Sequence, residues 1–160
     1  MTDFAGLLRT LSNHGVRFIV AGGAAATAHG SARLTIDVDV VYDRAPDNLE
    51  RLIEALGQFS PYLRGAPPGL PFSWNAATLA RGLNFTLTTS LGAIDLFGEL
   101  TGGGTYAALV PGSIAIELYG VTCRCLSIDQ LIAVKRAAGR PKDLDVIAEL
   151  EAIKEESTNR

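Results

Sequence analysis

The stretch GGAAATAHGSARLTIDVDVV, residues 22–41, decides the fold of this chain. It follows a short apolar run, Val16 to Ala21, that predicts a buried strand. Gly22 and Gly23 end that strand, and the small residues after them indicate a short, tightly packed helix. The chain then enters its best predicted strand, Leu34 to Tyr42, which carries two acids among apolar residues. A glycine turn therefore lies directly upstream of an acidic strand.

The two acids of that strand, Asp37 and Asp39, are one residue apart. They point to the same face of the strand, with Cα atoms about 6–7 Å apart. Carboxylates this close repel each other unless a cation neutralises them, and Mg²⁺ takes oxygen ligands from one or two carboxylates and from phosphates. The alternative is a half-exposed strand whose wet face carries two solvated acids. The two residues alone leave both interpretations open.

A third acid, Asp95, lies within the apolar run GAIDLF, residues 92–97. On a neighbouring strand it could complete a site for two metal ions, which activate an attacking oxygen and stabilise the leaving oxygen at phosphorus. In that scheme Asp37 and Asp39 bind metal, and Asp95 binds the ion nearest the attacking hydroxyl and accepts its proton. The alternative for Asp95 is an acid at the end of a hairpin that faces water.

Phosphate-binding candidates surround the acidic strand. Gly22 and Gly23 let backbone N–H groups approach an anion at the start of a helix, although a tight turn is the commoner reason for two glycines. Thr35 is in phase with both acids of the strand. Arg33 comes two residues earlier and could pair with a phosphate or with the acids themselves.

A second group of candidates is the basic segment KRAAGRPKD, residues 135–143. Cations near the end of a helix suit the helix dipole, which is the structural explanation for such a run. The functional interpretation is a basic clamp for a triphosphate, for which Lys135 and Lys142 are the best candidates. Position in the sequence does not decide between the two.

The remaining chain predicts one mixed α/β or α+β domain with a central sheet, residues 1–156, and a frayed tail, residues 157–160. The other predicted helices span 4–13, 46–59, 127–138 and 142–155, and the other predicted strands span 83–89, 93–97, 113–118 and 121–126. Residues 60–80 are rich in proline and are expected to form a loop.

Composition excludes several classes of protein. The chain has 160 residues, 48% of them hydrophobic, and a net charge of −3, which argues against disorder and against a nonspecific nucleic-acid coat. Its longest apolar stretch, Ile19 to Ala28, is about half of what a bilayer crossing needs. The N-terminus lacks the layout of a signal peptide, and Cys123 and Cys125 are poorly placed to bridge each other. We therefore expect a cytoplasmic protein with no membrane partner.

Residues 22–41 resemble the sequence signature of nucleotidyltransferases of the DNA polymerase beta superfamily, in which a Gly-Gly or Gly-Ser turn precedes an Asp-x-Asp strand. The fuller pattern is typical of small bacterial members near the AbiEii-like toxin group and the minimal nucleotidyltransferases. Its positions are filled here by Gly22, Gly23, Ala25, His29, Gly30, Arg33, Thr35, Asp37 and Asp39. A later segment is similar to the family's C-terminal motif K-x-x-x-x-R-x-K-D, filled by Lys135, Arg140, Lys142 and Asp143.

The resemblance implies a nucleotidyltransferase fold, a short mixed sheet flanked by helices. It also implies transfer of a nucleoside monophosphate from an NTP to a hydroxyl group, with Mg²⁺ or Mn²⁺ and release of pyrophosphate. By this match Gly22 and Gly23 hold phosphates, whereas Asp37, Asp39 and Asp95 bind metal. The implied acceptor is a tRNA end, a protein hydroxyl or a small molecule, and a toxin–antitoxin role rests on family analogy alone.

The chain departs from the superfamily in two ways. Many members have serine where this chain has Gly23, so backbone amides alone must hold the phosphate here. Larger relatives also add a helical domain that helps to bind the acceptor. Here we expect a partner to take the place of that domain, such as an antitoxin, another helical protein or a second copy of the chain. The alternative function is an inactive module of the same fold that binds a nucleotide or a partner. A purely structural role for the acids and glycines is the third interpretation.

Overall fold

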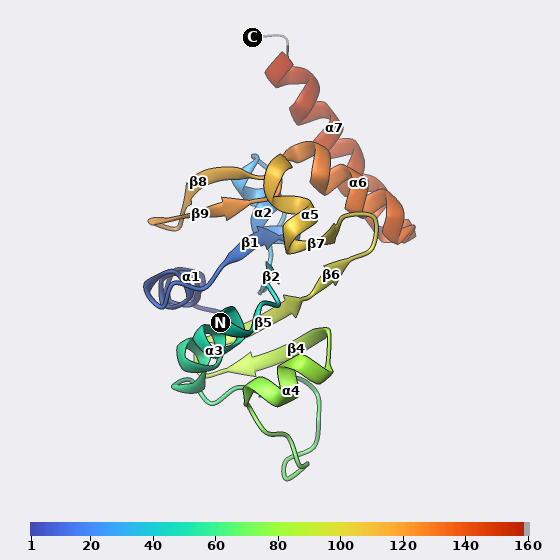
Figure 1. Ribbon diagram of the computed structural model, residues 1–160. Helices are drawn as coiled ribbons and strands as arrows, with labels where there is room; N and C mark the ends of the chain where they lie inside the picture. Colours follow the sequence, from blue (N-terminus) through green and yellow to red (C-terminus); the bar gives the residue numbers. More distant parts are fainter. Residues whose placement is uncertain (159–160) are drawn as a thin grey trace.

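Nine strands are present in the computed structural model, which describes residues 1–158 of the chain. They are β1 (Phe18–Ala21), β2 (Asp37–Tyr42), β3 (Tyr62–Leu63), β4 (Asn84–Thr89), β5 (Gly92–Phe97), β6 (Glu99–Leu100), β7 (Gly104–Thr105), β8 (Ile114–Leu118) and β9 (Val121–Cys125). Seven of them form one sheet in the order β3-β4-β5-β2-β1-β9-β8, and β6 and β7 form a separate ribbon. The acidic strand β2 is thus central in the main sheet (Figure 1).

The sheet is mixed, as the sequence predicts. Strand β2 runs antiparallel to β1 and parallel to β5, and β1 runs parallel to β9. The strands predicted at 83–89, 93–97, 113–118 and 121–126 are confirmed and form two hairpins, because β4 pairs antiparallel with β5 and β8 pairs antiparallel with β9. The fold is thus of the mixed α/β class, with its two acid-bearing strands side by side at the middle of the sheet.

Seven α-helices flank this sheet within the described residues. They are α1 (Phe4–Asn13), α2 (Gly22–Ala28), α3 (Pro46–Gly57), α4 (Ala76–Arg81), α5 (Tyr106–Leu109), α6 (Ile128–Ala138) and α7 (Leu144–Thr158). Helix α3 contacts α1 and α4, and α6 contacts α2 and α7, so the longer helices form two groups (Figure 1). A membrane-crossing helix would have to be longer and more apolar than any helix in residues 1–158.

Alternation along the central strands separates the core from the acids. Val38, Val40, Ile94 and Leu96 are fully buried and join the leucines of α1 and α3 in one hydrophobic cluster. The residues between them point to the opposite face. That face receives Asp37, Asp39 and Asp95, so the burial of one face positions the acids of the other.

The acidic strand is shorter than predicted. Strand β2 begins at Asp37, and the pairing with β5 begins at the same residue. Leu34 and Ile36 therefore lie outside the sheet, with 99% and 76% of their surface exposed. Ile36 therefore does not share the buried face with Val38. Strand β5 does extend to Gly92, but Thr2 lies between the strands there, and its Oγ1 donates to the Ile36 carbonyl at 2.6 Å and accepts from the Ala93 N–H at 3.2 Å.

Two further segments differ from the sequence prediction. Residues 60–80 contain the edge strand β3 and most of helix α4 rather than a plain loop, and Trp74 Nε1 donates a hydrogen bond to the Ile53 carbonyl at 3.0 Å. At the C-terminus, α7 continues to Thr158 and so includes the first half of the tail predicted at 157–160. Residues 159–160 lie outside the described part of the chain.

Candidate active site

The three predicted acids lie on one face of two adjacent strands. In the parallel pairing of β2 with β5, Asp39 is directly opposite Asp95, and Asp37 is opposite Ala93. Neighbouring strands are about 4.8 Å apart, so the Asp39 and Asp95 carboxylates share one position on the sheet. The structure therefore brings Asp95 to the pair on β2, a placement that spacing in the sequence could only suggest.

Of the three acids, Asp39 is the one whose surroundings most clearly favour a nearby cation. Burial raises the pKa of its carboxyl to about 7, and the negative charges of Asp95 and Asp37 contribute to the same shift. Lys135 acts in the opposite direction. The Asp39 Oδ1 atom is also buried without a hydrogen-bond partner. A positive charge brought to this oxygen would relieve both the desolvation and the repulsion.

An arginine that the sequence analysis did not single out lies between the other two acids. Arg64 follows β3, and its Nη1 donates to Asp37 Oδ2 at 3.5 Å. Its Nη2 lies 2.8 Å from Asp95 Oδ1, outside hydrogen-bonding geometry, and donates to the Leu87 carbonyl at 2.6 Å. With this arrangement, no group of three His, Cys, Asp or Glu side chains among residues 1–158 is placed to hold one metal ion.

The glycine turn lies against the same acids. Gly22 begins α2 with φ +58°, and a Cβ atom there would overlap the Asp39 carboxylate. A Cβ atom on Gly23 would lie 2.6 Å from Thr35 Oγ1. Thr35 itself donates to the Asp37 carbonyl at 3.2 Å. Both glycines are therefore needed for α2 to begin against the acidic strand, whichever ligand the turn holds.

We expect Gly22→Ala to lower the free energy of unfolding by about 1–3 kcal/mol, because the new methyl group is strained by φ and displaces the Asp39 carboxylate. Denaturant unfolding measures this loss. Gly69→Ala is the matched control, since Gly69 also has positive φ but its Cβ would meet no atom within 4 Å. Equal losses in the two variants would show that the contact with Asp39 has no part in the effect.

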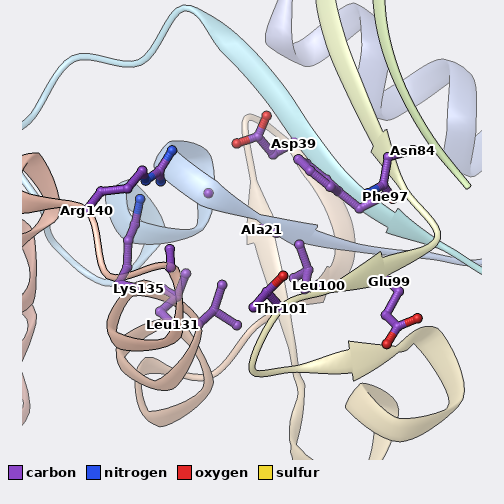
Figure 2. Close-up of a pocket in the computed structure, with 13 residues that line it drawn as sticks. Ala21, Asp39, Asn84, Phe97, Glu99, Leu100, Thr101, Leu131, Lys135 and Arg140 are labelled. Atoms are coloured by element: carbon purple, nitrogen blue, oxygen red, sulfur yellow. The ribbon is translucent and has the colours of Figure 1, made fainter.

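A cavity of about 290 Å³ opens beside Asp39, between the sheet and α6. Figure 2 shows the side chains of Asp39, Lys135 and Arg140 directed toward the same end of it. The other end is mainly apolar with a few polar groups, and its lining includes Asn84, Phe97, Glu99, Leu100, Thr101, Leu131, Val134 and Ala138. A charged end and an apolar end in one cavity suit a ligand with a phosphate part and a ring part.

One buried acid holds both cations of the cavity. Asp143 is 4% exposed, and its Oδ2 accepts from Arg140 Nε at 2.7 Å while its Oδ1 lies 3.5 Å from Lys135 Nζ. Burial alone would raise the pKa of the Asp143 carboxyl, but the hydrogen bond from Arg140 and the charge of Lys135 hold it below its ordinary value. Asp143 thus stays ionised and keeps two cations on one side of the site.

Two predicted binding residues lie elsewhere. Lys142 is exposed and does not line the cavity, where Arg140 is found instead. Arg33 Nε lies 3.8 Å from Glu149 Oε1, so this arginine pairs with helix α7 rather than with the acids. The other predicted residues, Gly22, Gly23, Thr35 and Lys135, lie with the acids or line the cavity.

Three residues of the site, two of which line the cavity, were not predicted from the sequence. Phe97 is in phase with Asp95 on β5, and Asn84 is opposite Phe97 on β4, so strand phase could have identified both. Arg64 had no comparable signal, because it is a single cation in a segment without periodicity.

The donor set fits a divalent cation in part. Asp39 and Asp95 provide two adjacent carboxylates, each with a buried oxygen that lacks a hydrogen-bond partner, and the guanidinium of Arg64 already stands where positive charge is required. Mg²⁺ is commonly held by one or two carboxylates together with substrate phosphates. Asp39 with Asp95, and Asp37 once Arg64 moves away, are the residues that would hold it.

Comparison with known structures supports the nucleotidyltransferase fold that the sequence predicts. The chain resembles the crystal structure of a protein from Thermotoga maritima that is provisionally described as a nucleotidyltransferase, with a TM-score of 0.51 and 16% sequence identity. The match covers 96% of this chain and 89% of that one. Neither the known protein-family profiles nor the curated proteins contain a match. At this identity the likeness concerns the fold and not the reaction.

Proposed function

We propose that this chain is a metal-dependent nucleotidyltransferase that transfers a nucleoside monophosphate from an NTP to a hydroxyl acceptor. One observation carries the proposal: Asp39 lies opposite Asp95 on a parallel strand and also lines a cavity whose same end receives Lys135 and Arg140. Acids that attract a metal and cations that attract phosphates are thus combined at one place. Such a pairing is what phosphoryl transfer requires, because its transition state carries charge on several oxygens.

Each residue of the site has a role in this reaction that follows from its position. The N–H groups at Gly22 and Gly23 and the side chains of Lys135 and Arg140 hold the phosphates of the NTP. A divalent cation, Mg²⁺ or Mn²⁺, bound to the acids would neutralise phosphate charge and orient the attacking group. The acceptor oxygen forms a bond to the α-phosphorus while the bond from that phosphorus to the bridging oxygen breaks. Pyrophosphate leaves with the electron pair, and Asp95 takes the hydroxyl proton.

The acceptor and the biological setting are the finer part of the proposal. We propose an RNA end such as tRNA, a protein hydroxyl or a small molecule as the acceptor, within a toxin–antitoxin pair of the AbiEii-like kind. A partner protein, an antitoxin or another helical protein, would then supply acceptor contacts. We place the reaction in the cytoplasm, in keeping with two buried cysteines that are free in the structure.

A second function is favoured by one specific observation. Arg64 pairs with Asp37 and Asp95, and no group of three His, Cys, Asp or Glu side chains among residues 1–158 is placed to hold a metal ion. A chain that kept Arg64 there permanently would bind nucleotide or a partner without turnover. The two functions differ in one measurable respect, which is metal-dependent release of pyrophosphate.

The test is label transfer with the purified chain, Mg²⁺, each α-labelled NTP in turn, and bulk bacterial tRNA or lysate. We expect label to move to RNA or to protein, and to stay on the NTP with Asp37→Asn/Asp39→Asn. Transfer that persists in this double variant would reject the proposed site. Nucleotide binding without transfer for every NTP and acceptor would favour the binding module.

A further inference from the structure

Arg64 differs from the arginines that tie the fold together. Arg17 is the contrasting case: its Nε donates to Asp43 at 2.7 Å, and its Nη1 and Nη2 donate to Asp47 at 3.0 and 2.9 Å. The whole guanidinium fork of Arg17 is thus used. Arg64 reaches Asp37 only at 3.5 Å, approaches Asp95 without hydrogen-bonding geometry, and leaves its buried Nε without a partner. The one short hydrogen bond of its guanidinium goes to the Leu87 carbonyl at 2.6 Å rather than to an acid, so Arg64 supplies charge to the acids without a hydrogen-bonded fork.

The backbone at Arg64 allows the side chain to leave. Its N–H group is fixed by a hydrogen bond to the Thr86 carbonyl, 3.0 Å away, so the main chain holds position without the guanidinium. Directly after it comes Gly65, with positive φ and open space around its Cβ position. Strand β3 before it has two residues and lies at the edge of the sheet. Edge segments of this kind open at low cost compared with central strands.

From this geometry we infer that Arg64 is a resident counter-ion of the acidic site, which a divalent cation displaces from Asp37 and Asp95. The inference rests on the proposed function, because it assumes that these acids bind metal. The guanidinium nitrogens approach Asp37 Oδ2 and Asp95 Oδ1, the same oxygens that a cation would need. Mg²⁺ demands ligands at about 2.0–2.1 Å in near-octahedral geometry, so the two cannot share these oxygens.

A resident counter-ion has two consequences. Without metal, Arg64 reduces the repulsion among three acids and keeps them together on the sheet. With metal, its charge must be removed from the site, so part of the metal's binding free energy is used for that displacement. Arg64 therefore sets how much metal is needed to load the site, and it is a positioning residue rather than a catalytic one.

The test measures Mn²⁺ affinity by titration calorimetry on the full chain without nucleotide. We expect Arg64→Gln to bind Mn²⁺ about tenfold more tightly than wild type, because the ion no longer has to displace a guanidinium from Asp37 and Asp95. Arg64→Lys keeps the charge and should bind about as weakly as wild type. Arg17→Gln is the matched control, since it removes an arginine that pairs with two acids away from the site, and it should leave Mn²⁺ affinity unchanged.

A second measurement does not depend on the folding of any variant. In wild-type protein, titration with Mg²⁺ should shift the arginine Nε signal of Arg64 in the NMR spectrum and leave that of Arg17 in place. Equal Mn²⁺ affinity of wild type and a folded Arg64→Gln, or an unchanged Arg64 signal at saturating Mg²⁺, would overturn the inference and leave the proposed function intact. No Mn²⁺ binding to any form without nucleotide would also overturn the inference, whereas the proposed function is tested separately by label transfer with NTP present.

Discussion

We expect Asp39→Asn to lower the rate of nucleotidyl transfer by at least about a thousandfold, since a metal ligand at phosphorus contributes several kcal/mol of charge stabilisation. Asp39 is the acid that all parts of the site share. It lies opposite Asp95, its carboxylate touches the turn at Gly22, and it lines the cavity that receives Lys135. An amide of equal size keeps these contacts but carries no negative charge. The assay is the initial rate of label transfer at saturating NTP and Mg²⁺.

The matched control for this variant is Asp145→Asn, which removes an exposed acid on α7 away from the cavity. It should retain the wild-type rate within about twofold, as surface substitutions away from special features usually have small effects. Circular dichroism of both variants must match wild type. A rate for Asp39→Asn within about fivefold of wild type would show that the reaction does not pass through this carboxylate.

The acids could be predicted from the sequence because strand alternation is a local property. Asp39 and Asp95 each stand between two buried apolar residues, and Asp37 precedes the buried Val38, so burial of these neighbours leaves the acids the other face. The register that places Asp39 opposite Asp95 was not predictable in the same way. It depends on how two strands pair whose facing residues are 56 positions apart in the chain (95 − 39), and spacing in the sequence does not determine that pairing.

The cations of the site could likewise be predicted only in part. Lys135 and Lys142 were the expected clamp, but a short turn at Pro141–Asp143 separates α6 from α7 and leaves Lys142 exposed. Arg140 enters the cavity instead, because its Nε is held by the buried Asp143. The basic run predicts that cations lie near the site. Which of them line the cavity depends on the buried Asp143, which pairs with Lys135 and Arg140.

Arg64 lay beyond prediction for a different reason. A lone arginine after a two-residue edge strand has no periodic or motif context. Its importance follows only from the sheet order, which places β3 next to β4, and β4 next to the strand of Asp95. The arginine that pairs with Asp37 and Asp95 thus comes from a segment that was expected to be a loop.

The second large effect concerns pH and the metal-free protein. Burial and the neighbouring acids raise the pKa of the Asp39 carboxyl from 3.8 to about 7. Between these two values the folded protein keeps a proton that the unfolded chain has already released, so the free energy of unfolding falls as pH rises. At 1.36 kcal/mol per unit we expect a loss of about 2–4 kcal/mol across this window, the lower figure allowing for screening by water in the open cavity.

Asp39→Asn isolates this contribution. In EDTA, the free energy of unfolding of wild type relative to the variant should fall between pH 4 and pH 8, as measured by denaturant unfolding. Asp47, Asp143 and Glu149 have lowered pKa values, so the stability that they contribute is lost only as pH falls into the acid range. Because both proteins contain these three residues, their effect cancels in the difference. A difference that stays constant with pH would show that Asp39 is ionised in the folded protein at an ordinary pKa.

Mg²⁺ should reverse the sign of this pH dependence. A metal ion binds the deprotonated carboxylate, so its stabilisation of the folded state grows as pH rises through the pKa of Asp39. Wild type should therefore gain more from saturating Mg²⁺ at pH 8 than at pH 5, whereas Asp39→Asn should gain little at either pH. Repulsion among the acids lowers the free energy of unfolding of the metal-free protein at neutral pH. The same repulsion favours the binding of a cation at this site. An equal gain at both values of pH would show that Mg²⁺ binds elsewhere on the chain.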